Sequence, residues 1–248
     1  MAKVALVTGG SGGIGAATAI LLARGGYDVA VTYLDNRAGG EATVAAIHAL
    51  GRRAIAVRAD TADESDVIGA FQVVDRELGP LSALVNNAGI VGAGSRVADL
   101  SAERLNRVLA VNVTGCFLAA REAVRRMSTR LGGSGGGIVN VSSAAARLGS
   151  PGEFVHYAAS KGAVDTFTLG LAKEVADEGI RVNAVRPGMI DTDIHAKSGL
   201  AERVAKIVPT VPMRRIGTAD EVAETIAWLL SDKASYVTGA ILDVAGGR

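Results

Sequence analysis

The sequence is poor in the residues that build disulfide frameworks, proline-rich segments and large aromatic surfaces. Its 248 residues include one cysteine, five prolines and 4% aromatics. The single Cys116 excludes a disulfide within the chain and any CxxC motif, which favours a reducing, cytoplasmic compartment. Glycine is abundant instead, with 32 residues. Without a G-x-y period these glycines must serve turns and close backbone approaches.

An excess of charge and long apolar runs are also missing. The 26 Lys and Arg balance 25 Asp and Glu, so the formal net charge is +1 and no basic surface for nucleic acid or an anionic membrane is expected. No apolar run approaches roughly 18 residues, which argues against a membrane span. Glycines interrupt residues 1–10 before an apolar stretch as long as that of a signal peptide is reached, so no signal peptide is expected. The length suits a single domain over residues 1–248.

Short apolar, β-branched runs alternate with longer helical patterns along the whole chain. Strands separated by helices and apolar on both faces predict a parallel sheet covered on both sides, that is, a doubly wound, Rossmann-type α/β fold. Capping boxes are predicted at residues 61–64 and 218–221. The predicted strands are 4–7, 28–33, 54–57, 83–85, 138–141, 181–185 and 240–243, and the predicted helices are 14–23, 41–50, 67–78, 102–127 and 157–176.

Two segments interrupt this alternation. The glycine-rich residues 132–137 suggest a flexible surface connector. Residues 188–215 follow a predicted strand without clear periodicity, where α/β folds bind ligands, so we interpret them as a substrate lid. A surface loop without a role in binding is the alternative. Its cations, which an anionic carrier could meet, are Lys197, Arg203, Lys206, Arg214 and Arg215. Its Asp191, Asp193 and His195 are more simply solvated than metal ligands, and no metal is expected.

A glycine-rich loop, residues 8–15, joins the first predicted strand to the first predicted helix. Gly10, Gly12 and Gly15 fit G-x-G-x-x-G, and Gly9, Gly13 and Gly15 fit G-x-x-x-G-x-G. Missing Cβ atoms let a pyrophosphate approach the free N–H groups of a helix N-terminus. A tight turn without a ligand is the alternative, but the strand-to-helix context favours phosphate binding.

Tyr157 and Lys161 stand one helical turn apart on one face of a predicted helix. A free Tyr has a pKa near 10, and a neighbouring cation favours its phenolate, which makes it usable for proton transfer near neutral pH. Asn86–Gly89, Ser142–Ser143 and Pro187–Gly188 each follow a buried strand at the sheet edge that carries the glycine loop.

Together these motifs resemble the short-chain dehydrogenase/reductase family over essentially the full chain, most of all its branch of 3-oxoacyl-carrier-protein reductases and sugar dehydrogenases. The resemblance implies that Tyr157 exchanges a proton with a ketone or secondary alcohol and that Lys161 assists it and holds the nicotinamide ribose. It further implies that Ser143 orients the substrate oxygen and that Asn112 anchors a relay water. Ser142 remains an alternative to Ser143, because the spacing to Tyr157 is longer than in many relatives.

The resemblance also implies a set of cofactor contacts and an assembly. Hydride would pass between the nicotinamide and the substrate carbon, and the chain would form a homotetramer. The expected cofactor residues are Gly9, Ser11, Gly13, Ile14, Gly15, Tyr33, Arg37, Asp60, Thr61, Asn87, Ala88, Gly89, Tyr157, Lys161, Pro187, Gly188, Ile190 and Thr192.

The end of the second strand bears on the choice of cofactor. Asp35 would favour NAD if its carboxylate met the ribose 2′-hydroxyl, whereas Arg37 offers a fork to the 2′-phosphate of NADP. With Ser11 beside Arg37 we expect NADP, and NAD stays open. The competing functions are a non-catalytic dinucleotide-binding regulator, for which an activated phenol has no use, and an epimerase or dehydratase, for which the chain is short.

Overall fold

The computed structural model describes residues 3–191 and 207–248 of the chain. Its main sheet has seven parallel strands in the order β3-β2-β1-β4-β5-β6-β9. The strands are β1 (Val4–Val7), β2 (Asp28–Tyr33), β3 (Ala54–Arg58), β4 (Ala83–Asn86), β5 (Gly136–Val141), β6 (Ile180–Pro187) and β9 (Ile241–Val244). The strand order reverses between β1 and β4, which is where doubly wound folds open a crevice at the carboxyl ends of their strands.

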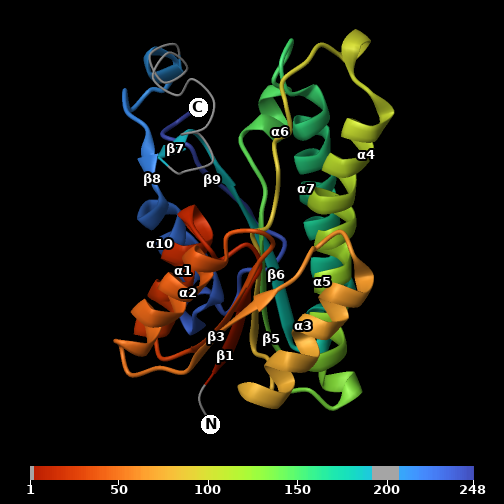
Figure 1. Ribbon diagram of the computed structural model, residues 1–248. Coiled ribbons are helices and arrows are strands. Elements are labelled where there is room, and N and C mark those ends of the chain that lie inside the picture. Colours follow the sequence, from red (N-terminus) through yellow and green to blue (C-terminus); the bar gives the residue numbers. More distant parts are fainter. Residues whose placement is uncertain (1–2, 192–206) are drawn as a thin grey trace.

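Helices cover both faces of this sheet (Figure 1). On one side lie α1 (Gly13–Arg24), α2 (Arg37–His48) and α10 (Ala219–Leu230), and on the other α3 (Glu64–Glu77), α4 (Ala102–Leu109), α5 (Gly115–Met127) and α7 (Val155–Glu174). A short helix, α6 (Ala145–Leu148), follows β5. The predicted doubly wound α/β fold is therefore confirmed. In the part of the chain that is described, every helix is too short or too polar to cross a bilayer.

The strands are apolar on both faces because each face has its own core. Ala5 and Val7 of β1 belong to the core shared with α1, α2 and α10. Val4 and Leu6, the alternate positions, belong to the core shared with α3, α5 and α7. Since successive side chains of a strand point to opposite faces, a continuous apolar run is what a doubly covered strand requires.

The helix predicted over residues 102–127 is interrupted. Between α4 and α5 the residues Ala110–Thr114 form one wider π-helical turn. Gly115 follows it, and a Cβ there would lie 2.6 Å from the carbonyl oxygen of Thr61. Such π bulges are frequent at functional sites, and this one carries Asn112.

Two local predictions are corrected and one is confirmed. Thr218 caps α10 with the reciprocal bonds of a capping box. At α3 the cap is Asp63, whose side chain accepts a bond from the Asp66 N–H, so no capping box begins at Thr61. The glycine run is not simply a connector, because β5 begins at Gly136, where a Cβ would lie 2.5 Å from the Met127 Sδ and from the Ser82 carbonyl oxygen.

Residues 188–215, which we interpret as a lid, are described only in part, since residues 192–206 lie outside the described residues. On either side of them, β7 (Ile190–Asp191) pairs in parallel with β8 (Gly217–Thr218). A 3₁₀ turn, Val208–Thr210, precedes β8. The β7–β8 pair therefore brings the described parts on either side of residues 192–206 together, close to the carboxyl end of β6.

Candidate active site

The glycine loop is fixed by packing that leaves no room for side chains. Gly9 has a φ of +65°, in the left-handed region that favours glycine. A Cβ at Gly15 would collide with the Gly9 carbonyl oxygen and lie 2.5 Å from the Asn87 Nδ2. Helix α1 begins at Gly13, and its N-cap residue Gly12 supplies no side-chain cap, so the first N–H groups of the helix lack the usual side-chain acceptor. This uncapped helix start behind a cradle without Cβ atoms fits an anionic phosphate group.

Asn87 holds this loop from the next strand. Its Nδ2 donates to the carbonyl oxygens of Thr8, at 3.0 Å, and of Gly9, at 2.9 Å. The backbone N–H groups of Asn87 and Ala88 donate to the Thr8 Oγ1, both at 3.0 Å. The Asn87 side chain, expected at the cofactor, is thus engaged in shaping the loop.

A cavity of about 150 Å³ lies beside the loop, between the carboxyl ends of β2, β3 and β4. Asp60 is held there by Arg107, whose Nη2 donates to the Asp60 Oδ2 at 3.0 Å. Nothing in the sequence around Arg107 had indicated a site residue. Of the expected cofactor residues, the cavity brings together Gly9, Ser11, Tyr33, Asp60, Thr61, Ala88 and Gly89.

Arg37 and Asp35 do not line this cavity. The Arg37 Nε donates to the Glu41 Oε1 at 2.7 Å along helix α2, and its side chain is 75% exposed. The neighbouring Asn36 donates from its Nδ2 to the Ser11 carbonyl oxygen at 3.1 Å. Asn36 thus contacts the glycine loop, whereas the Arg37 guanidinium is paired with a carboxylate of its own helix.

Lys161 is buried on α7 beside Tyr157. Its Nζ donates to the Val141 carbonyl oxygen at 2.7 Å and lies 5.9 Å from the centroid of the Tyr157 ring. A Cβ at Gly89 would lie 3.3 Å from the same Nζ. Burial lowers the pKa of Lys161 to about 8, while Cys116 and Asp165 act in the opposite direction. The ammonium thus lies between the Tyr157 ring and the loop that follows β4.

The two adjacent serines have different surroundings. Ser142 is buried, and its Oγ donates to the Lys161 carbonyl oxygen at 3.1 Å. Ser143 lines a cavity of about 410 Å³ together with Tyr157, and its Oγ accepts a bond from the Ala145 N–H at 3.1 Å. Pro187 and Gly188 line the same cavity. Only Ser143 of the two thus shares a cavity with Tyr157.

Asn112 is fully engaged within the π-helical turn. Its Oδ1 accepts from the Ile90 N–H at 2.8 Å, and its Nδ2 donates to the Ile90 carbonyl oxygen and to the Ser160 Oγ, both at 2.9 Å. The Ser160 hydroxyl in turn donates to the Tyr157 carbonyl oxygen at 2.7 Å. Through these bonds Asn112 connects the loop after β4 to the backbone of the helix that carries Tyr157 and Lys161.

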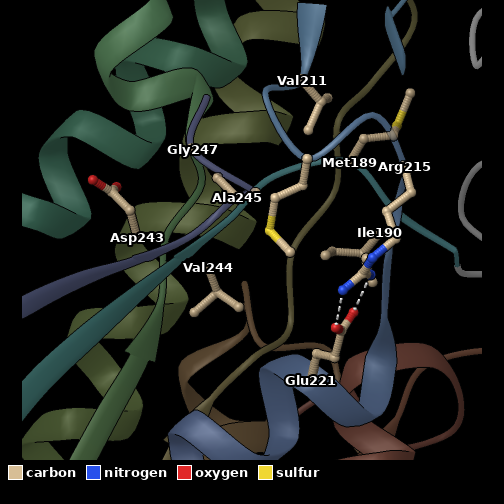
Figure 2. Close-up of a pocket in the computed structure, with 12 residues that line it drawn as sticks. Met189, Ile190, Val211, Arg215, Glu221, Asp243, Val244, Ala245 and Gly247 are labelled. Carbon is tan, nitrogen blue, oxygen red and sulfur yellow. Dashed lines mark hydrogen bonds and ion pairs between the residues drawn. The ribbon is translucent and has the colours of Figure 1, made fainter. Parts of the chain in front are cut away.

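A further pocket of about 310 Å³ lies between β7, the segment 211–215 and the end of β9 (Figure 2). Ile190, expected at the cofactor, lines this pocket and not the one with Tyr157. Arg215 also lines it, and both of its terminal nitrogens bind the Glu221 carboxylate, as Figure 2 shows. Gly13, Ile14 and Asn87 line none of the three pockets named here.

Several predicted positions lie outside the described residues: Thr192, Asp193, His195, Lys197, Arg203 and Lys206. Asp191 is described, and it is exposed at the end of β7. Among the residues that are described, no three His, Cys, Asp or Glu side chains gather as a metal site would require.

Known proteins resemble the chain over almost its whole length. The family model described as "Enoyl-(Acyl carrier protein) reductase" matches residues 9–248. An uncharacterized oxidoreductase of Escherichia coli (strain K12), YgfF, is 57% identical over 245 residues, covering 99% of each chain. Glucose 1-dehydrogenase 2 of Bacillus subtilis (strain 168) is 38% identical, covering 99% of this chain and 94% of its own. The 3-oxoacyl-[acyl-carrier-protein] reductase FabG of Staphylococcus aureus (strain Mu50 / ATCC 700699) is also 38% identical, covering 100% and 98%.

Solved structures share the whole fold. A short-chain dehydrogenase from Burkholderia cenocepacia J2315, in complex with NADP, superposes with a TM-score of 0.91 at 41% identity, covering 99% of this chain and 97% of its own. An NAD⁺-bound xylitol dehydrogenase superposes with a TM-score of 0.90 at 35% identity, covering 99% and 98%. Both nicotinamide cofactors therefore occur on this fold among its near structural neighbours.

Proposed function

The chain is an NAD(P)-dependent oxidoreductase of the short-chain dehydrogenase/reductase family, and we propose that it interconverts a ketone and its secondary alcohol with NADP. The observation that carries this proposal is the cavity shared by Ser143 and Tyr157, with the buried Lys161 ammonium 5.9 Å from the Tyr157 ring centroid. A non-catalytic dinucleotide sensor, the alternative, has no use for such an arrangement.

In this proposal Tyr157 gives a proton to the substrate oxygen during reduction and takes it back during oxidation. The Lys161 ammonium favours the phenolate electrostatically, and the hydroxyl of Ser143 hydrogen-bonds the same substrate oxygen. A bound nicotinamide supplies or takes up the hydride. Asn112 acts as a positioning residue through its bonds to Ile90 and Ser160, and we propose that it also anchors the relay water.

We propose that the glycine loop and the α1 N-terminus hold the pyrophosphate, and that the cavity lined by Tyr33, Asp60 and Thr61 holds the adenosine. The nicotinamide ribose would meet Tyr157 and Lys161, with Gly188 on the substrate side. The remaining proposed contacts are those of the loop and its neighbours: Gly9, Ser11, Gly13, Ile14, Gly15, Asn87, Ala88, Gly89, Pro187, Ile190 and Thr192. Residues 188–215 would close over the substrate as a lid of a single domain.

The preference for NADP rests on Arg37 and Ser11. Arg37 would leave Glu41 to bind the 2′-phosphate, and this exchange costs little because the pair is largely exposed. Asp35 is exposed, and its backbone carbonyl accepts the Arg37 N–H at 3.0 Å. NAD would instead require a carboxylate that reaches the ribose.

We further propose a cytoplasmic homotetramer. Phe117 of α5 and Leu169 of α7 are 48% and 43% exposed, and Trp228 of α10 and Tyr236 near β9 are 41% and 103% exposed. Large apolar side chains on two separate surfaces support two interfaces between copies. The buried thiol of Cys116 suits a reducing compartment. Light scattering of the wild type and of Phe117→Glu tests the assembly: a smaller particle for the variant is expected.

The experiment that tests the proposed activity follows NADPH and NADH absorbance across a panel of ketones, sugars and acyl thioesters. We expect turnover of at least one carbonyl compound, faster with NADPH. Lys161→Ala should lose both turnover and cofactor affinity. Absence of turnover across the panel with either cofactor, despite tight cofactor binding, would favour the non-catalytic alternative.

A further inference from the structure

The cavity that contains Ser143 and Tyr157 has an uneven distribution of charge. Apolar residues such as Val91, Leu148 and Met189 line it together with polar ones such as Ser143 and Ser150, so its walls are mixed. Among the residues that line it, only Arg248 and Glu153 carry an ordinarily charged side chain, and neither forms an ion pair with any described residue. Glu153 is exposed, whereas Arg248 is half-buried.

The backbone of Arg248 is held in place from two sides. The Arg147 Nη2 donates to the Arg248 carbonyl oxygen at 2.8 Å, and the Arg248 N–H donates to the Ala245 carbonyl oxygen at 3.3 Å. Gly246 and Gly247 between them have φ values of +62° and +88°, which side chains rarely tolerate. Arg147 belongs to α6, the short helix that follows Ser143. The chain after β9 is therefore anchored to the segment that carries the proposed substrate-orienting serine.

The described cations of α6, of β6 and of the lid ends are already bonded within the protein. Arg147 lies 3.4 Å from the Asp243 carboxylate, and Arg186 lies 2.8 Å from that of Asp165. Arg215 of the lid pairs with Glu221 in the neighbouring pocket. Arg214 donates to the Pro209 carbonyl oxygen on the exposed surface. Among the residues that line the cavity of Tyr157, Arg248 is thus the cation, and it has no carboxylate partner in the described part of the chain.

We infer that Arg248 determines substrate specificity by binding a carboxylate of the substrate, so that the preferred substrates are oxo acids and their hydroxy acids. The inference rests on the proposed function of the same site. The guanidinium of the half-buried Arg248 offers a planar fork that matches a carboxylate, and the partial burial of this residue reduces the competition from water. Exposed Glu153 would be largely screened and would oppose such a substrate only weakly.

The test compares 3-oxobutanoate with its neutral methyl ester, each reduced with NADPH by wild type, Arg248→Gln, Arg248→Lys and Glu153→Gln. Arg24→Gln, which removes an exposed cation at the end of α1, is the matched control. For Arg248→Gln we expect the KM of the acid to rise about tenfold or more, as for a lost charge-assisted contact, with its kcat and the KM of the ester nearly unchanged. Arg248→Lys should recover part of the loss, and Glu153→Gln and the control should not raise the KM of the acid.

A second measurement does not depend on turnover. Binding of butyrate to the NADP⁺-loaded protein should weaken about tenfold in Arg248→Gln and stay unchanged in Arg24→Gln. If Arg248→Gln raises the KM of the acid and of the ester equally, or raises neither, the role of Arg248 is refuted. The proposed function then still stands, because the ketones are turned over. The proposed function fails only if no compound of the wider panel is reduced with either cofactor. Butyrate that binds wild type and Arg248→Gln equally, or does not bind wild type, refutes the role of Arg248 on its own.

Discussion

The glycine loop and the cavity of Tyr157 open at the same edge of the sheet, yet they are built in different ways. The loop is closed by contacts that leave no space: a Cβ at Gly10 would lie 2.7 Å from Val31, and Asn87 bonds two of the loop's carbonyl oxygens. The cavity gathers residues from segments as distant as 91, 154, 207 and 248, and encloses about 410 Å³. Side chains cannot be added to the loop without a clash, whereas the residues that line the cavity can be substituted one at a time.

This difference explains why the class of cofactor can be predicted from the sequence and the substrate cannot. A pyrophosphate is recognised through backbone N–H groups, which only a glycine pattern exposes at close range. A substrate is recognised through side chains whose identity can vary without disturbing the fold, because they line open space. Substitutions in the cavity should therefore change mainly the activity, and substitutions in the loop should change mainly the stability and the binding of the cofactor.

The largest effect is expected for Tyr157→Phe, on the substrate side. The variant keeps the ring and loses the transferable proton, so kcat should fall by about a thousandfold or more, while NADPH affinity changes little. Stopped-flow kinetics and fluorescence titration measure the two quantities. Activity above a few per cent of wild type would exclude Tyr157 as the acid–base group.

The next effect separates two neighbouring residues. Ser143→Ala should lower kcat/KM about a hundredfold, because it removes a donor to the substrate oxygen. Ser142→Ala should lower it less than about tenfold and instead cost about 1 kcal/mol of unfolding free energy, since its bond to the Lys161 carbonyl oxygen is internal. The reverse result would assign the substrate contact to Ser142.

Lys161 links the two regions, and its pKa gives a test in the protein without cofactor. Burial lowers this pKa to about 8 in the folded state, below the unfolded value near 10.4. Between these pH values the unfolded chain binds more protons, so the unfolding free energy should rise with pH, by about 2 kcal/mol from pH 8 to pH 10. Urea unfolding of wild type and Lys161→Met measures it, and the same pH slope in both would contradict the buried ammonium.

On the cofactor side, Gly15→Ala should act through packing. The added Cβ meets the Gly9 carbonyl oxygen and the Asn87 side chain, so we expect a loss of about 1–2 kcal/mol in unfolding free energy together with weaker NADPH binding. Gly69→Ala is the matched control, because its Cβ would meet nothing within 4 Å inside α3. The control should gain about 0.5 kcal/mol from helix propensity. Equal effects of the two substitutions in urea unfolding would show that the loop is not tightly packed.

The smallest effect is expected at Arg37. Because the guanidinium is exposed and paired with Glu41, Arg37→Ala should weaken NADPH binding only about five- to tenfold and leave NADH unchanged. Glu41→Gln should strengthen NADPH binding slightly by releasing the arginine. Fluorescence titration with both cofactors tests this, and tighter binding of NADH than NADPH by wild type would reverse the proposed preference.

The sequence by itself determined the α/β class, the glycine loop and the pairing of Tyr157 with Lys161. These features depend on local periodicity or on spacings within one element, such as a single turn of α7. The predicted strands lie within two residues of β1 to β6 and β9 for the same reason, since a strand buried on both faces has to be apolar throughout.

Only the tertiary structure decided which residues of each motif line a cavity. The orientation of Ser142 and Ser143 depends on how β5 ends against α7, and the π turn at Asn112 depends on the approach of Gly115 to Thr61. Arg107 and Arg248 carry no local signal, because Arg107 binds Asp60 across 47 residues of chain and the Arg248 carbonyl oxygen is bound by Arg147 across 101. Contacts between distant segments are fixed by the packing of the whole sheet, and no pattern within one segment records them.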